Sequence, residues 1–201
     1  GLVGSEMCIR DRRVCAFDPN TSVDISGNKD SLKGHYKTGG SKELKKAVDS
    51  LCGFTADKYA VSTANQFKNA INVLSGAQIS VPERISYKTK ELSLSLMPGN
   101  QTVKGETLLK YFRYCLTPSG GGAQKQGELL CMLFSQYINK TYLAFGRNYF
   151  SQIIDSLDTD ISIVDFSRCE RTLSAMAAGD IKYTSVSSAG ELTVTPGKRG
   201  K

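Results

Sequence analysis

The sequence predicts a single layered α/β domain. Segments with helical periodicity alternate with short strand-like segments, and glycines follow several of the helical segments. The chain has 201 residues, of which 40% are hydrophobic and 22% are charged. These values suit one globular domain with a sizeable core. No internal repeat or low-complexity linker divides the chain. We therefore expect helices and strands to pack in layers around one core.

In the first half of the chain, apolar residues at positions i, i+3, i+4 and i+7 predict a helix over Lys42–Leu51. Ser41 is its expected N-cap, and Gly53 is its expected stop. Residues 27–30 are expected to form a loop. The other elements expected here are strands at Val14–Asp18, Ser22–Ser26 and Lys58–Thr63, and a helix at Asn65–Leu74.

In the second half, alternating leucines predict a strand at Leu92–Leu96, after an earlier strand at Gln78–Val81. Three consecutive glycines, Gly120–Gly122, predict a flexible loop before a long helix. The helices expected here are Thr107–Tyr114, Gln124–Asn139, Tyr149–Leu157 and Arg168–Ala178, and the last two strands are Ile161–Val164 and Ile181–Val186.

Charge and cysteine usage argue against two classes of function. The formal net charge is +7, and the closing residues 197–201 supply three of the positive charges. No basic stripe carries interleaved aromatic residues, so we expect no nucleic-acid partner. The six cysteines form no Cys-x-x-Cys pair, and His35 is the only histidine, so a zinc site is not expected.

The two ends of the chain are set apart from the domain. Residues 1–12 resemble the translated read-through of a sequencing adapter, and we expect them to be non-native. The domain is expected to span residues 13–190 and to be incomplete at its N-terminus, with a basic tail at 191–201. No run of about 18 apolar residues occurs, so no transmembrane helix is expected within this sequence.

An ordered series of short motifs carries a resemblance to a known family. The motifs are Tyr36-Lys-Thr-Gly-Gly40, Leu51-Cys-Gly53, Leu74-Ser-Gly76, Leu96-Met-Pro-Gly99 and Tyr111-Phe-Arg-Tyr114. Over roughly Ala16–Tyr183 the chain resembles the LytR–CpsA–Psr family, the bacterial cell-wall glycopolymer ligases. This resemblance implies a three-layer α/β/α sandwich around a mixed central β-sheet.

The resemblance also implies a function. Members of the family transfer a glycopolymer from a polyprenyl-pyrophosphate carrier to peptidoglycan, usually with Mg²⁺. The intact protein is expected to be anchored by an N-terminal membrane helix that this chain lacks, with the domain outside the cytoplasm, in the bacterial cell envelope. Arginines are suited to grip the pyrophosphate because a planar guanidinium binds phosphate oxygens through two hydrogen bonds.

Four residues are expected at the site by this resemblance. Arg113 matches a family arginine and is expected to clamp phosphate. Lys125 lies where a second catalytic cation is expected, and Gln126 matches a family glutamine beside it. Lys33 is a further expected phosphate contact. The metal-binding aspartates of the family would lie upstream of residue 13.

Other positions depart from the family pattern. Pro19 and Asn20 stand where an arginine and an aspartate are expected. Cys115 replaces an arginine, and Gly122 replaces an aspartate. Because a lost charged contact typically costs several kcal/mol in the transition state, these changes favour an alternative. That alternative is a pseudoenzyme that binds polyprenyl phosphate or a wall component without turnover. A third hypothesis is a purely structural domain with a filled core.

Overall fold

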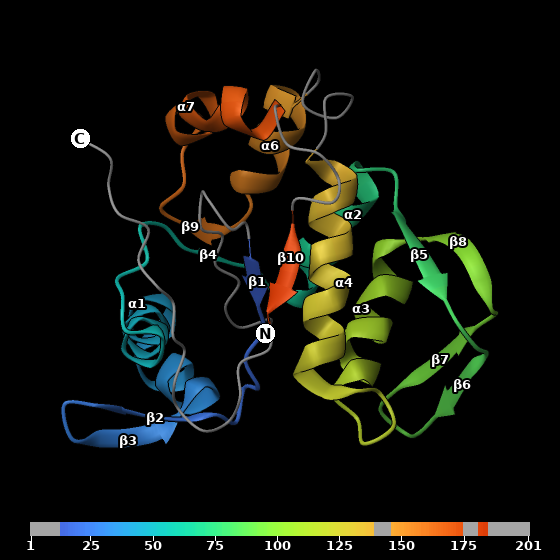
Figure 1. The fold of residues 1–201 in the computed structure, drawn as a ribbon, viewed down its shortest axis with the longest axis horizontal. Coiled ribbons are helices and arrows are strands. Elements are labelled where there is room, and N and C mark those ends of the chain that lie inside the picture. Colours follow the sequence, from blue (N-terminus) through green and yellow to red (C-terminus); the bar gives the residue numbers. More distant parts are fainter. Residues whose placement is uncertain (1–12, 139–145, 175–180, 185–201) are drawn as a thin grey trace.

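The computed structural model describes residues 13–138, 146–174 and 181–184, and these residues form a mixed α/β fold (Figure 1). The α/β class is therefore confirmed. The helices are α1 (Leu32–Cys52), α2 (Ala64–Val73), α3 (Gly105–Cys115), α4 (Gly122–Tyr137), α6 (Gly146–Ile154) and α7 (Ile163–Ser174). The strands are β1 (Arg13–Cys15), β2 (Ser22–Ile25), β3 (Asn28–Ser31), β4 (Ala60–Val61), β5 (Ala77–Val81), β6 (Ile85–Lys88), β7 (Ser93–Leu96), β8 (Gly99–Val103), β9 (Asp158–Thr159) and β10 (Lys182–Thr184).

The strands of the described residues pair two by two. β1 and β10 are parallel, whereas the pairs β2–β3, β4–β9, β5–β8 and β6–β7 are antiparallel. Parallel and antiparallel pairing are thus both present, but within the described residues these pairs do not join into one central sheet. Two side chains of α4 form hydrogen bonds with the backbone of β5 and of the residue before it. The Gln78 amide donates to Oε1 of Gln136 at 3.0 Å, and the Tyr137 hydroxyl donates to the Gly76 carbonyl at 2.6 Å.

The four strands β5–β8 form one long, interrupted hairpin. β5 pairs with β8, and β6 continues from β5 to pair with β7. Residues 82–84 connect β5 to β6, and residues 97–98 connect β7 to β8. The β5–β6 connection is therefore one residue longer than the β7–β8 connection opposite it, and it bends. Pro82 and Pro98 lie in these breaks, where a missing N–H costs no ladder hydrogen bond.

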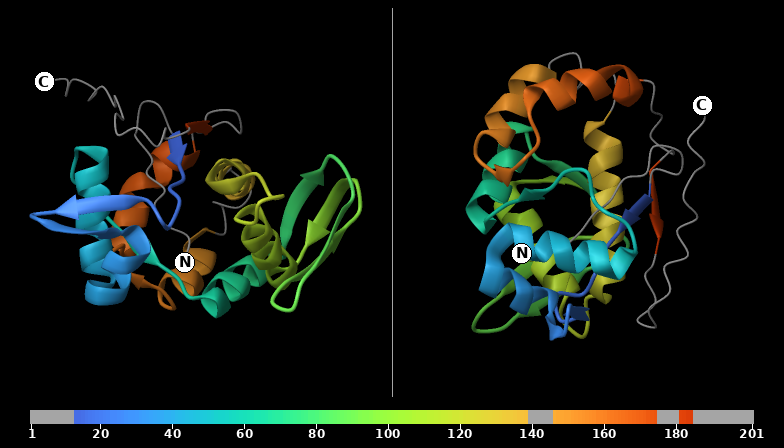
Figure 2. Two further views of the ribbon diagram at one scale, coloured as in Figure 1. Left: turned by 90° about the horizontal axis from the view of Figure 1, so that it is seen from below. Right: turned by 90° about the vertical axis from the view of Figure 1, so that its left-hand side faces the viewer.

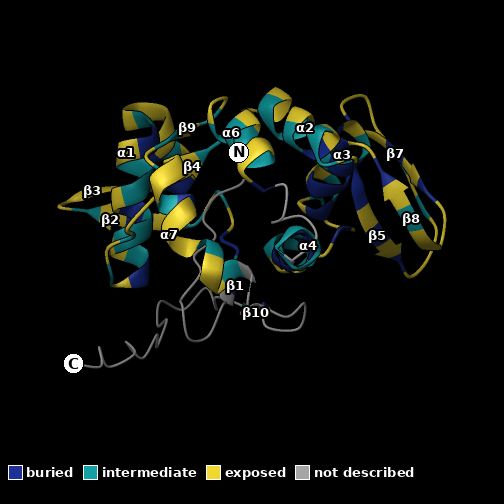
Figure 3. Cartoon of the chain, turned by 90° about the horizontal axis from the view of Figure 1, so that it is seen from above, coloured by how far each residue is buried: buried dark blue, intermediate teal, exposed yellow. Residues whose placement is uncertain are grey.

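The described residues form three hydrophobic clusters. Two of them lie on either side of the molecule (Figures 1 and 2), and a small third one packs β1 and β10 against α4 through Val14, Cys131 and Ile181. The first joins α1 to β2 and includes Phe17, Val23 and Leu32. The second joins α2, α3, α4 and the long hairpin, and its buried residues include Leu108 and Phe112. Exposed residues lie on the outer face of the hairpin, whose strands alternate between buried and exposed positions (Figure 3).

Helix α1 begins ten residues earlier than expected. Its N-cap is Ser31, whose hydroxyl accepts from the Gly34 amide at 3.0 Å. The helix kinks at Gly40, where φ is 63°, so the expected helix from Lys42 is its second segment. Gly40 is the non-helical residue before this second segment, so Ser41 is its first residue and not its N-cap, and the Ser41 hydroxyl donates to Asp158.

Two other local predictions were wrong. Residues 28–31 form β3 and not a loop, because Ser26 and Gly27 both adopt positive φ and make a tight hairpin turn. Ile163 begins α7 and does not belong to a strand. Ser162 and Asp165 cap this helix reciprocally: the Ser162 amide donates to Asp165 at 2.9 Å, and the Asp165 amide donates to the Ser162 hydroxyl at 3.3 Å. The segments 1–12 and 191–201, and parts of the last predicted elements, lie outside the described residues.

Candidate functional site

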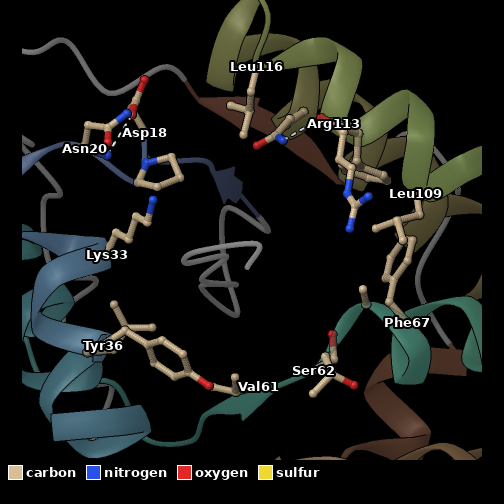
Figure 4. Close-up of a pocket in the computed structure, with 16 residues that line it drawn as sticks. Asp18, Asn20, Lys33, Tyr36, Val61, Ser62, Phe67, Leu109, Arg113 and Leu116 are labelled. Carbon is tan, nitrogen blue, oxygen red and sulfur yellow. Dashed lines mark hydrogen bonds between the residues drawn. The ribbon is translucent and has the colours of Figure 1, made fainter. Parts of the chain in front are cut away.

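A cavity of about 600 Å³ lies between the two cores (Figure 4). One side is formed by the first turns of α1 and by the segment that connects β1 to β2. The other side is formed by α2, α3 and the start of α4, and β4 completes the lining. Its size is within the usual range for pockets that bind small molecules or cofactors.

Two cationic side chains line this cavity from opposite sides (Figure 4). Arg113 comes from the last turn of α3, and Lys33 comes from the first turn of α1. The Lys33 amide donates to the Pro19 carbonyl at 2.9 Å, which holds the start of α1 against the β1–β2 connection. Both side chains belong to exposed residues, so their charges need no buried counter-ion.

Apolar side chains form much of the remaining lining. Phe67 packs edge-on against Phe112, with ring centroids 5.5 Å apart and an interplanar angle of 84°. Leu109 and Leu116 extend this surface along α3. The other apolar lining residues are Leu44 of α1 and Val61 of β4. The cavity therefore combines two positively charged side chains with an apolar surface.

Gln126 and Lys125 are neighbours in sequence, but the structure separates them. Gln126 is buried, and its amide donates to the Phe112 carbonyl at 2.8 Å while it lines the cavity. Lys125 does not line the cavity, and its ammonium pairs with Glu128 at 3.1 Å. Partial burial lowers the pKa of Lys125, but the hydrogen bond and charge of Glu128 outweigh burial and raise the pKa. The structure thus brings Arg113, Lys33 and Gln126 together and leaves Lys125 apart.

The β1–β2 connection contributes polar groups that the sequence analysis did not assign to the site. Asp18 lines the cavity, and its Oδ1 accepts from the Asn20 amide at 2.7 Å and from Asn20 Nδ2 at 3.0 Å. Tyr36 also lines the cavity, one turn after Lys33 on α1. Lys33 and Tyr36 share a helix face because they are three residues apart, but the helix was predicted only from Lys42, so this signal was missed.

Other reactive side chains have structural roles. His35 is buried, and its Nε2 lies 3.0 Å from the Val23 carbonyl oxygen within the first core. Cys115 is fully buried in the second core, and burial raises the pKa of its thiol to about 12. This thiol is therefore neutral at physiological pH and is a poor nucleophile.

The described residues do not fit a metal site built from several protein ligands. Among them, no three His, Cys, Asp or Glu side chains gather closely enough to hold an ion. Asp18 is the one carboxylate among the described cavity residues. Within residues 13–138, 146–174 and 181–184, no helix is long and apolar enough to cross a lipid bilayer.

The chain is similar to several known proteins of one family. It is 31% identical over 122 residues to the regulatory protein MsrR of Staphylococcus aureus strain Mu50, covering 58% of this chain and 36% of MsrR. It is 21% identical over 169 residues to the polyisoprenyl-teichoic acid–peptidoglycan teichoic acid transferase TagV of Bacillus subtilis strain 168, covering 81% and 43%. The chain thus spans less than half the length of either relative.

Solved structures show the same fold. The crystal structure of Bacillus subtilis TagV superposes with a TM-score of 0.75 at 20% identity, covering 88% of this chain and 71% of that one. A structure of TagT bound to LI-WTA superposes with a TM-score of 0.63 at 17% identity, covering 87% and 66%. The LytR_cpsA_psr family model matches residues 9–196. The resemblance seen in the motifs is therefore confirmed, and this chain belongs to the LytR–CpsA–Psr family.

Proposed function

We propose that this domain transfers a glycopolymer from a polyprenyl-pyrophosphate carrier to peptidoglycan outside the cytoplasm. The observation that carries the proposal is the cavity between the two cores, which combines Arg113 and Lys33 with an apolar surface. Family membership supports it, and so does the name of the relative TagV, a polyisoprenyl-teichoic acid–peptidoglycan teichoic acid transferase.

The two ends of such a carrier match the two kinds of surface in the cavity. A diphosphate suits the space between Arg113 and Lys33, because two cations on opposite sides offset its negative charge. The isoprenoid chain suits Phe67 and Leu109, because each buried CH₂ group contributes about 0.8 kcal/mol. The buried Gln126 amide donates to the Phe112 carbonyl. This hydrogen bond holds the start of α4 against the last turn of α3, which carries Arg113.

In the proposed reaction, a hydroxyl oxygen of the acceptor forms a bond to the phosphorus that carries the glycopolymer. The bond from this phosphorus to the bridging oxygen breaks, and polyprenyl monophosphate leaves with the electron pair. The hydroxyl proton passes to solvent. Arg113 and Lys33 stabilise the negative charge that grows on the leaving phosphate, because positioned cations act strongly at such a centre.

Mg²⁺ remains part of the proposal by family resemblance. When bound, it would neutralise phosphate charge. Mg²⁺ prefers six oxygen ligands, and Asp18 is the one carboxylate that lines the described cavity. Substrate phosphates and water would therefore have to supply most of the ligands. An N-terminal membrane anchor is likewise proposed only from the family.

The second candidate function is binding of polyprenyl phosphate without turnover. One specific observation favours it: Arg113 and Lys33 are the only cations among the described residues that line the cavity. Lys125 is turned toward Glu128, and Pro19 lines the cavity at a position where an arginine is expected.

Titration with a fluorescent prenyl pyrophosphate tests the site. We expect Arg113→Ala to weaken binding roughly tenfold to a hundredfold, since a hydrogen bond to a charged group contributes about 1.5–3 kcal/mol. Arg84→Ala is the matched control, because Arg84 is exposed between β5 and β6 and does not line the cavity. Equal loss in both variants would contradict the proposal.

Turnover separates the two candidates. The assay follows release of polyprenyl monophosphate from a lipid-linked glycopolymer in the presence of peptidoglycan and Mg²⁺. It uses the full-length protein, because this chain spans only part of its relatives. Release that Arg113→Ala slows supports the transferase, whereas tight binding without release supports the second candidate.

A further inference from the structure

Helix α7 turns one side toward solvent, and that side begins with two apolar residues. Ile163 and Val164 are consecutive, and they are 41% and 54% exposed. Three other large hydrophobic residues are similarly exposed in the part of the chain that the structure describes. Of these, Tyr36 and Leu116 line the cavity, and Met97 lies between β7 and β8. The cavity therefore does not account for the exposed Ile163–Val164 pair.

The other residues on this side of α7 are basic or neutral. Successive residues of a helix are turned by about 100°, so positions three, four and seven residues apart share one side. Exposed residues run along α7 (Figure 3), and among them Arg168 and Arg171 follow Val164 by four and seven residues. Neither arginine forms an ion pair within the described residues. We call the exposed residues of this side the α7 face: Ile163, Val164, Ser167, Arg168, Arg171 and Thr172.

The carboxylates of α7 lie off this face. Asp165 pairs with Lys58 at 3.1 Å, and Glu170 pairs with Arg147 of α6 at 3.8 Å. Phe166 lies between the two carboxylates in sequence, and its buried ring packs against α6. These contacts fix which side of α7 faces solvent. The charge on that side is therefore positive.

Two further carboxylates precede α7, and both are hydrogen-bonded to other segments. Asp158 accepts from the Ser41 hydroxyl of α1, and Asp160 Oδ1 accepts from the Tyr59 amide at 2.8 Å. Strand β9, which contains Asp158, pairs with β4, and Val61 of β4 lines the cavity. Short hydrogen-bonded segments thus connect α7 to the cavity, so the orientation of the α7 face fixes that of the cavity.

An anionic lipid bilayer matches both kinds of group on the α7 face. Arginines are attracted to the negatively charged headgroups, and exposed apolar side chains enter the boundary between headgroups and acyl chains. A soluble polyanion would bind the arginines but would leave Ile163 and Val164 in water. The formal net charge of +7 adds attraction of the same sign.

We propose that α7 docks on an anionic bilayer, with Ile163 and Val164 in the headgroup boundary and Arg168 and Arg171 at the lipid phosphates. The inference goes beyond the proposed function, because it holds whatever ligand the cavity binds. Docking through one face gives the cavity a constant orientation to the membrane surface. A carrier lipid in that membrane would then meet the cavity from one direction.

Co-sedimentation with vesicles of phosphatidylcholine, with and without phosphatidylglycerol, tests the docking. These vesicles contain no prenyl lipid, so the cavity is not probed. We expect Arg168→Gln/Arg171→Gln to weaken binding to the phosphatidylglycerol vesicles roughly tenfold to thirtyfold and to reduce the salt dependence. Ile163→Ser/Val164→Ser should weaken binding about tenfold and keep the salt dependence, because it removes apolar contact and no charge.

Matched controls are needed because the closing residues 197–201 carry three positive charges that attract the same vesicles. Arg84→Gln/Lys90→Gln removes two exposed cations that flank β6, and Met97→Ser removes an apolar side chain that is 60% exposed. Each control should change binding by no more than about twofold. All the substituted side chains are exposed, so every variant should unfold at the temperature of the wild type.

Three results would overturn the docking. Equal loss in Arg84→Gln/Lys90→Gln would show a general attraction of charge and no defined face. If Arg168→Gln/Arg171→Gln loses binding to soluble polyphosphate but keeps binding to vesicles, the α7 face binds polyanions and not a bilayer. A wild-type chain that binds phosphatidylglycerol vesicles no better than phosphatidylcholine vesicles also contradicts it. The proposed function would survive each of these results, because titration with a prenyl pyrophosphate tests it separately.

Discussion

At the scale of single residues, the neighbourhood of a lysine decides whether it is available to a phosphate. Lys33 lines the cavity, and within the described residues it forms no ion pair with a carboxylate. Lys125 pairs with Glu128 at 3.1 Å and lies outside the lining. A phosphate would have to compete with Glu128 for Lys125, whereas Lys33 needs no such exchange.

We therefore expect Lys33→Ala to weaken binding of a prenyl pyrophosphate roughly tenfold, and Lys125→Ala to change it by no more than about twofold. Isothermal titration at two salt concentrations measures both effects, and the Lys33→Ala variant should also show the smaller salt dependence. A large loss in Lys125→Ala would restore the catalytic role that the sequence predicts for that residue.

At the scale of elements, the helices were predictable because their apolar residues recur with helical spacing. The segments expected at Asn65–Leu74 and Thr107–Tyr114 overlap α2 and α3 almost completely. β6 and β8 were missed because their stability comes from partners in the long hairpin and not from their own pattern. β8 is mostly polar, Gly99–Val103, and it pairs with the alternating strand β5.

The cap of α7 gives a pH-dependent prediction at this scale. Hydrogen bonds from Ser162 and the ammonium of Lys58, 3.1 Å away, lower the pKa of Asp165 to about 2 from its ordinary 3.8. A folded-state pKa below the unfolded value stabilises the fold above pH 3.8, and the stabilisation is lost as the pH falls toward 2. Asp165→Asn should therefore be less stable than the wild type at pH 7.

Urea unfolding at pH 7 and at about pH 2 measures this difference. The gap in midpoint between the wild type and Asp165→Asn should shrink at the lower pH, because the wild-type carboxyl is then largely protonated. Asp155→Asn is the control, because Asp155 follows α6 and forms no ion pair within the described residues. A gap that is constant with pH would show that the cap does not depend on the charge.

At the scale of the whole molecule, the cavity lies between two halves, one built around α1 and the other around α2, α3 and α4. This arrangement explains which cavity residues could be predicted from the sequence and which could not. Arg113, Gln126 and Lys33 were found through family motifs, each within one short segment. The sequence did not indicate that Asp18 and Tyr36 line the same cavity as Arg113. Whether these residues lie close together depends on the distance between α1 and α3 across the cavity. The local periodicity of the sequence carries no information on that distance.

A ligand that bridges the two halves should stabilise them together. Binding only the folded state adds about 2.7 kcal/mol when the free ligand is at a hundred times its Kd, and for a chain of this size that raises Tm by roughly 5–10 °C. We expect prenyl pyrophosphate to produce such a shift in the wild type and a smaller one in Arg113→Ala at the same concentration. Hydrogen exchange should slow in the first turns of α1 and in the last turn of α3 alike, because Lys33 and Arg113 both line the cavity. Protection confined to α3 would mean that the ligand contacts only one side of the cavity, and the two halves would then not share a binding site.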